Sequence, residues 1–352
     1  MALASLGRVE GGYPLIWAGR TDNSKLPCPL VLMICKPVFM DKPSAPHMAT
    51  PPVLILAFNR PGPARHVFMA IRSARPARLF IACDGPRMHK PGEAALVSEV
   101  RDLVKLVDWP CAVETRFLEQ NLGCGKAVSS AIEWFLGRAG EGIILEDDCQ
   151  PTPAFFRFTA VMLERYRHDD RVALISGSNM APLASIAGEY AFSSAVSCWG
   201  WATWKRTWDS YRLQIPEISP QEAWVQAAHP RMVAKLVKEI QRTSRGDCHT
   251  WDFQLLVQCL RSGQLSVVPK WNLVLNIGFD GDGAHYGAGG RPWSVPHEAH
   301  DPATNWNRVE PVTANQQYDT HYLASSHRGS GVLYRQWLKL RHLLARARWF
   351  RF

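Results

Sequence analysis

The chain has 352 residues, of which 47% are hydrophobic and 20% are charged, a composition that suits a globular protein with a large core. Its formal net charge of +9 is concentrated at the ends: residues 320–352 hold seven Lys or Arg and no acid, and residues 1–47 hold five Lys or Arg and three acids. The remaining residues are close to neutral, which argues against nucleic acid as a partner.

The first 47 residues give no clear structural signal. Their apolar piece, residues 30–40, is interrupted by Lys36 and Pro37 and lacks the features of a signal peptide. No apolar run of about 20 residues predicts a transmembrane helix. Nine cysteines without CxxC pairs are typical of reduced thiols in a cytoplasmic protein. We therefore expect residues 1–47 to be a disordered extension or a mis-assigned start before Met48, and we expect a cytoplasmic protein.

Apolar strands alternate with helical patterns between residues 48 and 180. Continuous apolar runs are typical of strands that are buried on both faces of a parallel sheet. Such runs lie at residues 53–58, 79–83, 113–117, 142–145 and 172–176. Thr152 and Pro153 are favoured at the start of a helix, which we expect to reach Arg167. The alternation predicts an α/β fold with a Rossmann-like, mostly parallel sheet flanked by helices.

Polar residues follow four of these strands directly. They are Asn59 and Arg60, then Asp84, then Asn121 and Gly123, and finally the triplet Glu146, Asp147 and Asp148. Open α/β sheets bind ligands at the carboxyl ends of their strands, so one nucleotide lying across these ends would meet all four groups.

The acidic triplet carries the strongest chemical signal. Three adjacent carboxylates repel one another unless a cation stabilises them. Mg²⁺ and Mn²⁺ prefer oxygen ligands and bridge carboxylates to substrate phosphates. Residues 146–148 therefore predict a metal–diphosphate site, and the alternative is a solvated acidic turn before the next helix.

Residues 181–300 have a different character, because four tryptophans occur within ten residues. They are Trp199, Trp201, Trp204 and Trp208. A long helix is predicted at residues 221–242, and a strand at 265–268. A shorter helix is predicted at 252–261, opened by Thr250 and ended by Gly263.

The last part of the chain has two notable segments. Residues 276–290 are rich in glycine and include Asp280, Asp282 and His285. Residues 333–352 predict a basic amphipathic helix within a C-terminal extension, residues 301–352. Two interpretations of this helix remain open: it packs on the body, or its Trp/Leu face contacts the inner surface of an anionic membrane.

The order of these motifs resembles a known family. The motifs are Phe58-Asn59-Arg60-Pro61, Asp84, Glu146-Asp147-Asp148, Gly200-Trp201, Thr250-Trp251-Asp252 and His285. They are similar, over roughly residues 50–290, to nucleotide-sugar-dependent glycosyltransferases of the GT-A fold. The likeness is greatest to the branch of the eukaryotic N-acetylglucosaminyltransferase I enzymes and their bacterial relatives. That branch has Glu-Asp-Asp where most GT-A enzymes have Asp-X-Asp.

The resemblance implies that the two halves of one domain bind different substrates. Residues 48–180 would bind the nucleoside-diphosphate sugar, and residues 181–300 would bind the acceptor and carry the catalytic base. Asp148 would ligate Mn²⁺ or Mg²⁺, Asp147 would contact the ribose or a metal-bound water, and Glu146 would support them. A further set would contact the substrates: Arg60 and Asp84 for a nucleoside such as uridine, and His285 for the diphosphate.

The same resemblance assigns the catalytic base to Asp252, which would deprotonate the acceptor hydroxyl in an inverting displacement. The eukaryotic enzymes have two adjacent acids after the tryptophan, whereas Phe253 follows Asp252 here, so the register stays open by one residue. The acceptor would be a glycan or a lipid-linked sugar of the bacterial cell surface.

Each assignment has a plainer alternative. Asp252 can be an acid favoured by a helix N-terminus, His285 a surface loop residue and Arg60 a solvated turn residue. Trp199, Trp201 and Trp251 can line a sugar pocket, although tryptophan is more often core. Two other functions also compete: a sugar-phosphate nucleotidyltransferase and a non-enzymatic carbohydrate-binding protein.

Overall fold

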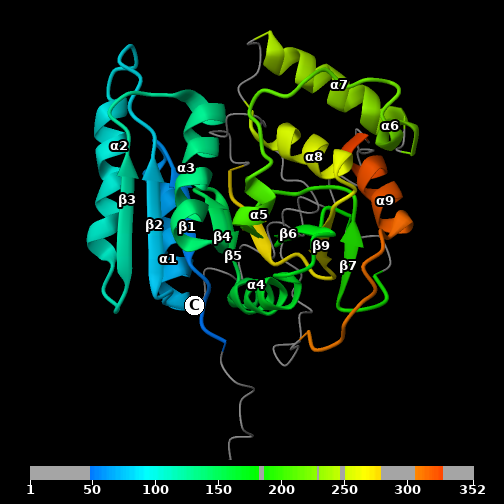
Figure 1. The fold of residues 1–352 in the computed structure, drawn as a ribbon. Coiled ribbons are helices and arrows are strands. Elements are labelled where there is room, and N and C mark those ends of the chain that lie inside the picture. The colour runs from blue at the N-terminus through cyan, green and yellow to red at the C-terminus, as the bar shows by residue number, and fades with distance from the viewer. Residues whose placement is uncertain (1–47, 182–185, 228–229, 246–249, 279–305, 328–352) are drawn as a thin grey trace, which may run out of the picture. The chain divides into compact units, whose positions relative to one another are not determined.

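The computed structural model describes residues 48–181, 186–227, 230–245, 250–278 and 306–327 (Figure 1). Two compact units divide the chain, Met1–Ser44 and Ala45–Phe352, and all described residues belong to the second. The predictions for residues 1–47, for His285 and for the basic segment 333–352 lie outside the described residues. No helix among the described residues is long and apolar enough to cross a bilayer.

One eight-stranded sheet runs through this unit in the order β3-β2-β1-β4-β8-β6-β9-β7. Its first four strands are parallel: β1 (Val53–Ala57), β2 (Arg78–Cys83), β3 (Ala112–Phe117) and β4 (Glu141–Glu146). The others are β6 (Val172–Ser176), β7 (Tyr190–Ser193), β8 (Trp201–Trp204) and β9 (Leu265–Pro269). Because β8 is antiparallel to both β4 and β6, the sheet is mixed. The predicted α/β class with a mostly parallel sheet is confirmed.

Helices cover both faces of the sheet (Figure 1). Those on one face are α1 (Pro61–Ala74), α2 (Glu93–Arg101) and α4 (Pro153–Tyr166), and those on the other are α3 (Gly123–Ala139), α5 (Lys205–Trp208) and α8 (Asp252–Arg261). Strand side chains alternate between faces, so Ile55 joins the core under α1 while Leu54 joins the core under α3. A two-stranded sheet of β5 (Cys149–Pro151) and β10 (Val274–Asn276) follows the end of β4.

The remaining helices lie in the second half. The single helix predicted at residues 221–242 is wrong: the structure has α6 (Ala223–Ala227) and α7 (Pro230–Ser244). Proline lacks a backbone N–H and suits the first turn, so Pro230 begins a helix instead of continuing one. Leu236 of α7 packs in one apolar cluster with Leu260 of α8. A 3₁₀ turn (Asp102–Leu106) follows α2, and α9 (Gln316–His327) ends the described chain.

Two helix starts test the predicted capping. The Thr152 hydroxyl accepts a hydrogen bond from the Phe155 N–H at 3.3 Å, and a proline stands in the first turn, as predicted. The α8 bounds are also as predicted, but its N-cap residue is Trp251 and not Thr250. The Thr250 hydroxyl instead donates to the Asp252 carboxylate.

Candidate functional site

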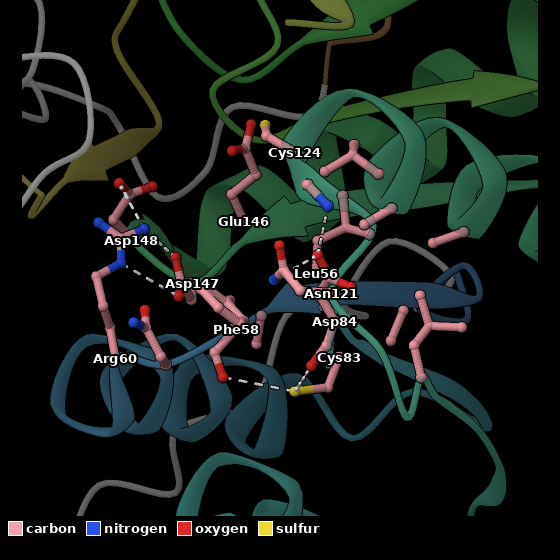
Figure 2. A pocket seen from close by; sticks show the side chains of 18 of the residues that line it. Leu56, Phe58, Arg60, Cys83, Asp84, Asn121, Cys124, Glu146, Asp147 and Asp148 are labelled. Carbon is pink, nitrogen blue, oxygen red and sulfur yellow. Dashed lines mark hydrogen bonds and ion pairs between the residues drawn. The ribbon is translucent and has the colours of Figure 1, made fainter. Parts of the chain in front are cut away.

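A cavity of about 520 Å³ opens at the carboxyl ends of the parallel strands (Figure 2). This volume falls in the range of small-molecule sites. Every residue predicted after the first four strands lines it: Asn59, Arg60, Asp84, Asn121, Gly123, Glu146, Asp147 and Asp148. The structure thus brings four separate segments of the sequence into one pocket.

The acidic triplet is divided between the two faces of the sheet. Glu146, the last residue of β4, is in register with Leu56, which belongs to the core under α3. Leu145 belongs to the opposite core, and Asp147, two residues further, meets Arg60 at the start of α1. In Figure 2 the Glu146 side chain points away from Arg60. The side chains of the three acids therefore point to different sides of the sheet, although their charges still interact.

Arg60 is the cation between the other two acids. Its Nε donates to Asp147 Oδ2 at 3.3 Å, and its Nη2 donates to Asp147 Oδ1 and, at 3.1 Å, to Asp148 Oδ2. Burial lowers the pKa of Arg60, but the two carboxylates outweigh this effect and raise it. Burial raises the pKa of Asp147 to about 6, although Arg60 opposes the shift. The Asp147 side chain is only 5% exposed, so this ion pair is a buried one.

The donor chemistry of this pair fits a hard divalent cation. Carboxylate oxygens of Asp147 and Asp148 already converge on one positive group. Among the described residues, no three or more His, Cys, Asp or Glu are grouped to hold a metal ion. Mg²⁺ is commonly bound by only one or two carboxylates together with waters and substrate phosphates. A metal here would therefore depend on the substrate to complete its coordination.

Asp148 is held tightly by the segment that follows β10. Its carbonyl accepts the Ile277 N–H at 2.8 Å, and a Cβ on Gly278 would come within 2.3 Å of its Oδ2. Only glycine leaves room for the carboxylate in this position. The described part of the predicted glycine-rich stretch thus borders the acidic pair.

Glu146 and Asp252 form a second acidic region. The Glu146 carboxylate makes no hydrogen bond or ion pair with another described residue. Burial raises its pKa well above the ordinary value, and the negative charges of Asp148, Asp147 and Asp252 raise it further. Asp252 does not line the cavity, but it is close enough to Glu146 for their charges to interact.

Asp84 lines the pocket, but its carboxylate is hydrogen-bonded mainly to the loop before α3. Oδ1 accepts the N–H groups of Gly85 at 2.8 Å and Leu122 at 2.9 Å. Oδ2 accepts Asn121 Nδ2 at 3.0 Å and the Gly123 N–H at 3.1 Å. A carboxylate has about four acceptor sites, and all are used. Asp84 therefore fixes the start of α3, and the nucleoside contact that the resemblance implies for it stays a prediction.

Glu93 was not identified from the sequence, yet it joins the loops after β1 and β2. Its Oε1 accepts Asn59 Nδ2 at 2.9 Å, and its Oε2 accepts the Arg87 backbone N–H at 2.7 Å. Hydrogen bonding to the Arg87 guanidinium lowers the pKa of Glu93 to about 2. Asn59 is thereby held in the pocket wall. No local pattern signals this role, because the partners lie 34 and 6 residues away.

The tryptophans occupy two different environments. Trp199 lines the cavity. Trp201 is fully buried in β8 and stacks on Trp251, which is 3% exposed, with ring centroids 5.7 Å apart. The structure places both in the core under α3 and not in the pocket wall, which corrects the prediction that they line a sugar pocket. The alternative role, core packing, describes them.

Further residues in the cavity wall were missed at the sequence level. They are Arg87, Arg116, Cys124, Asn276 and Gly278, with several apolar residues of β1, β2 and α3. Arg116 had a usable signal, since it is the last but one residue of a predicted strand. Its orientation depends on the register of β3 with β2, which the sequence does not show.

No family model and no curated protein matches this chain. Among solved structures, the mannosyltransferase PcManGT from Pyrobaculum calidifontis, in complex with GDP-Man and Mn²⁺, matches with a TM-score of 0.32 and 11% identity. That match covers 47% of this chain and 48% of the other, so it spans about half of the mannosyltransferase. HddC from Yersinia pseudotuberculosis matches with a TM-score of 0.29 and 14% identity, over 50% and 86% of the two chains. Likenesses this distant carry no information about activity.

Proposed function

We propose that this protein is a metal-dependent glycosyltransferase that uses a nucleoside-diphosphate sugar. One observation carries the proposal: polar residues from four strand ends line one cavity, and two of its carboxylates converge on a single cation. A nucleoside diphosphate needs such a site, with an acidic pair for its metal and an apolar wall for its nucleoside.

The residues at the strand ends would bind and orient the donor. Asp147 and Asp148 would hold Mn²⁺ or Mg²⁺, which neutralises charge on the departing diphosphate. Arg60, released from the acids, would donate to phosphate oxygens with its planar fork. The Asp84–Asn121–Gly123 hydrogen bonds would keep the pocket wall rigid, so that the donor is held for in-line attack.

Asp252 would accept the proton of the attacking hydroxyl. It stands at the first position of α8, and the Thr250 hydroxyl donates to its Oδ1, which orients the carboxylate. Asp252 is close enough to Glu146 for their charges to interact, which supports a base beside the donor site. Direct displacement with one base would invert the configuration of the transferred sugar.

Finer assignments follow from the motif resemblance. They are membership of the N-acetylglucosaminyltransferase I branch, a uridine-linked donor, Mn²⁺ as the metal and a glycan or lipid-linked acceptor. Contact of residues 333–352 with the inner face of a membrane, in a bacterial cytoplasmic enzyme of cell-surface glycan synthesis, belongs to the same proposal.

Titration calorimetry tests the core of the proposal. UDP, GDP and TDP would be titrated into the protein with Mn²⁺ and with EDTA, and again into Asp148→Ala. Asp209→Ala serves as the matched control, because Asp209 directly follows α5, is exposed, pairs with Lys205 and does not line the cavity. We expect one diphosphate to bind in Mn²⁺ alone, with binding lost in Asp148→Ala and kept in the control. Binding that survives EDTA or Asp148→Ala contradicts the proposal.

A turnover assay separates the two enzyme classes. Incubation with the matching nucleoside-diphosphate sugar should release the free nucleoside diphosphate. Release of pyrophosphate from a nucleoside triphosphate and a sugar phosphate would instead identify a nucleotidyltransferase.

A further inference from the structure

A row of four side chains crosses the floor of the cavity. Leu56 of β1 is in register with Glu146 of β4 and Ala82 of β2, and Ala82 is in register with Arg116 of β3. Register partners in a parallel sheet point to the same face, which here is the face under α3. Neighbouring strands are about 4.8 Å apart, so three spacings separate the backbones of Glu146 and Arg116 by about 14 Å.

This row makes a trough with the carboxyl group of Glu146 at one end and the guanidinium of Arg116 at the other. Its middle is apolar, with Leu56 and Ala82 below and Val128 and Ala131 of α3 alongside. The acidic end adjoins Asp147 and Asp148, where a diphosphate would lie. The basic end therefore lies where the nucleoside of a bound diphosphate would extend.

Arg116 has spare hydrogen-bonding capacity at this end. Its Nη2 donates to Ser130 Oγ at 3.1 Å, and it forms no ion pair with a described acid. Four of its five N–H donors thus have no described partner. Asn121 complements it: Nδ2 donates to Asp84 Oδ2 and the Gly85 carbonyl, while Oδ1 has no hydrogen bond to a described residue.

We infer that Arg116 selects the nucleobase, and that it selects a base with a ring carbonyl next to a ring N–H. This inference rests on the proposed function. Arg116 donates to the carbonyl oxygen, and Asn121 Oδ1 accepts from the adjacent N–H. Uracil, thymine and guanine present this pair of groups, and arginine pairs well with the two acceptors of guanine. Adenine has no ring carbonyl, and cytosine has a carbonyl without a ring N–H beside it, so neither base matches both Arg116 and Asn121.

The test compares four diphosphates and pyrophosphate by calorimetry in Mn²⁺. UDP, GDP, CDP, ADP and inorganic pyrophosphate are titrated into wild type, Arg116→Gln and Arg65→Gln, the last an exposed arginine of α1 outside the cavity wall. Wild type should bind UDP or GDP about tenfold or more tightly than CDP and ADP. The stronger of UDP and GDP identifies the base.

Arg116→Gln should weaken binding of the preferred diphosphate about tenfold, because it removes charge-assisted hydrogen bonds. Its affinities for the four nucleoside diphosphates should then differ by no more than about threefold. Pyrophosphate, which does not reach β3, should bind wild type and Arg116→Gln equally. Arg65→Gln should behave as wild type. Thermal unfolding checks that the variants fold, and Arg116→Lys, which keeps the charge but not the fork, should also lose the preference.

The outcomes separate the inference from the proposed function. If neither a diphosphate nor pyrophosphate binds in Mn²⁺, the proposed function fails. If they bind but Arg116→Gln keeps the wild-type preference, or wild type prefers CDP or ADP, the role of Arg116 is refuted and the metal–diphosphate site stands.

Discussion

Replacing Arg60 by glutamine should destabilise the metal-free protein. The substitution removes the only positive charge that contacts Asp147 and Asp148 among the described residues. Removing one partner of a buried ion pair costs about 3–5 kcal/mol. The Asp147 side chain is 5% exposed, but those of Asp148 and Arg60 are 17% and 24% exposed, which reduces the cost to about 2–3 kcal/mol. A domain of this size loses about 2–4 °C per kcal/mol, so we expect a Tm lower by roughly 4–12 °C in EDTA.

The same variant should respond more strongly to metal. Without Arg60 the two carboxylates have no internal cation, so Mn²⁺ should raise the Tm of Arg60→Gln more than that of wild type. Differential scanning calorimetry with and without Mn²⁺ measures both effects. Arg72→Gln is the control, since Arg72 and its partner Asp108 are about half exposed and solvent screens their pair, so its loss should change the Tm little. Equal Tm values for the two variants in EDTA, or equal Mn²⁺ shifts in wild type and Arg60→Gln, would refute the reasoning.

Three further changes test other parts of the site. Gly278→Ala should displace the Asp148 carboxylate and weaken Mn²⁺-dependent diphosphate binding at least about tenfold, measured by calorimetry. Gly137→Ala is the control and should bind as wild type, because a Cβ at residue 137 meets open space. Asp252→Asn should lower kcat by about 10²–10⁴ and leave the diphosphate Kd unchanged, and an unaffected kcat would assign the base elsewhere. Glu93→Gln should cost about 1–2 kcal/mol at pH 7, measured by urea unfolding. The folded pKa of Glu93 is lowered to about 2, so this stability is present above the unfolded pKa near 4.3 and is lost as pH falls toward 2. If the difference in unfolding free energy between wild type and Glu93→Gln stays constant over this pH range, the ion pair is disproved.

The cavity position was predictable because buried parallel strands are local features of the sequence. Each is a short apolar run, and the first polar residues after the runs gather at one edge by topology alone. That reasoning located the Arg60, Asp84 and Glu146–Asp148 segments before any coordinates. It also located the helix start at Thr152, where one side chain and the following turn are sufficient.

Local pattern failed where a role depends on a distant partner. The sequence shows Asp84 only as an acid that follows a strand, whereas the four donors that bond its carboxylate come from residues 85 and 121–123. Trp199 and Trp201 are two residues apart, yet only the first borders the cavity, because β8 is inserted between β4 and β6 and buries the second. The prediction of one long helix at residues 221–242 did not allow for Pro230, whose missing N–H favours a new helix start.

By itself, therefore, the sequence determined six strands of the large sheet, the polar groups that follow the first four and the acidic character of the site, since these depend on composition and periodicity within a few residues; it did not show β5, β7, β8 or β10. Only the tertiary structure decided how those groups are used. The register of four strands placed Arg116 across the trough from Glu146, and the alternation of side chains sent Glu146 to one face and Asp147 to the Arg60 side. Register and ion pairing are settled by contacts between segments up to 90 residues apart, and the local sequence of one segment does not show such contacts.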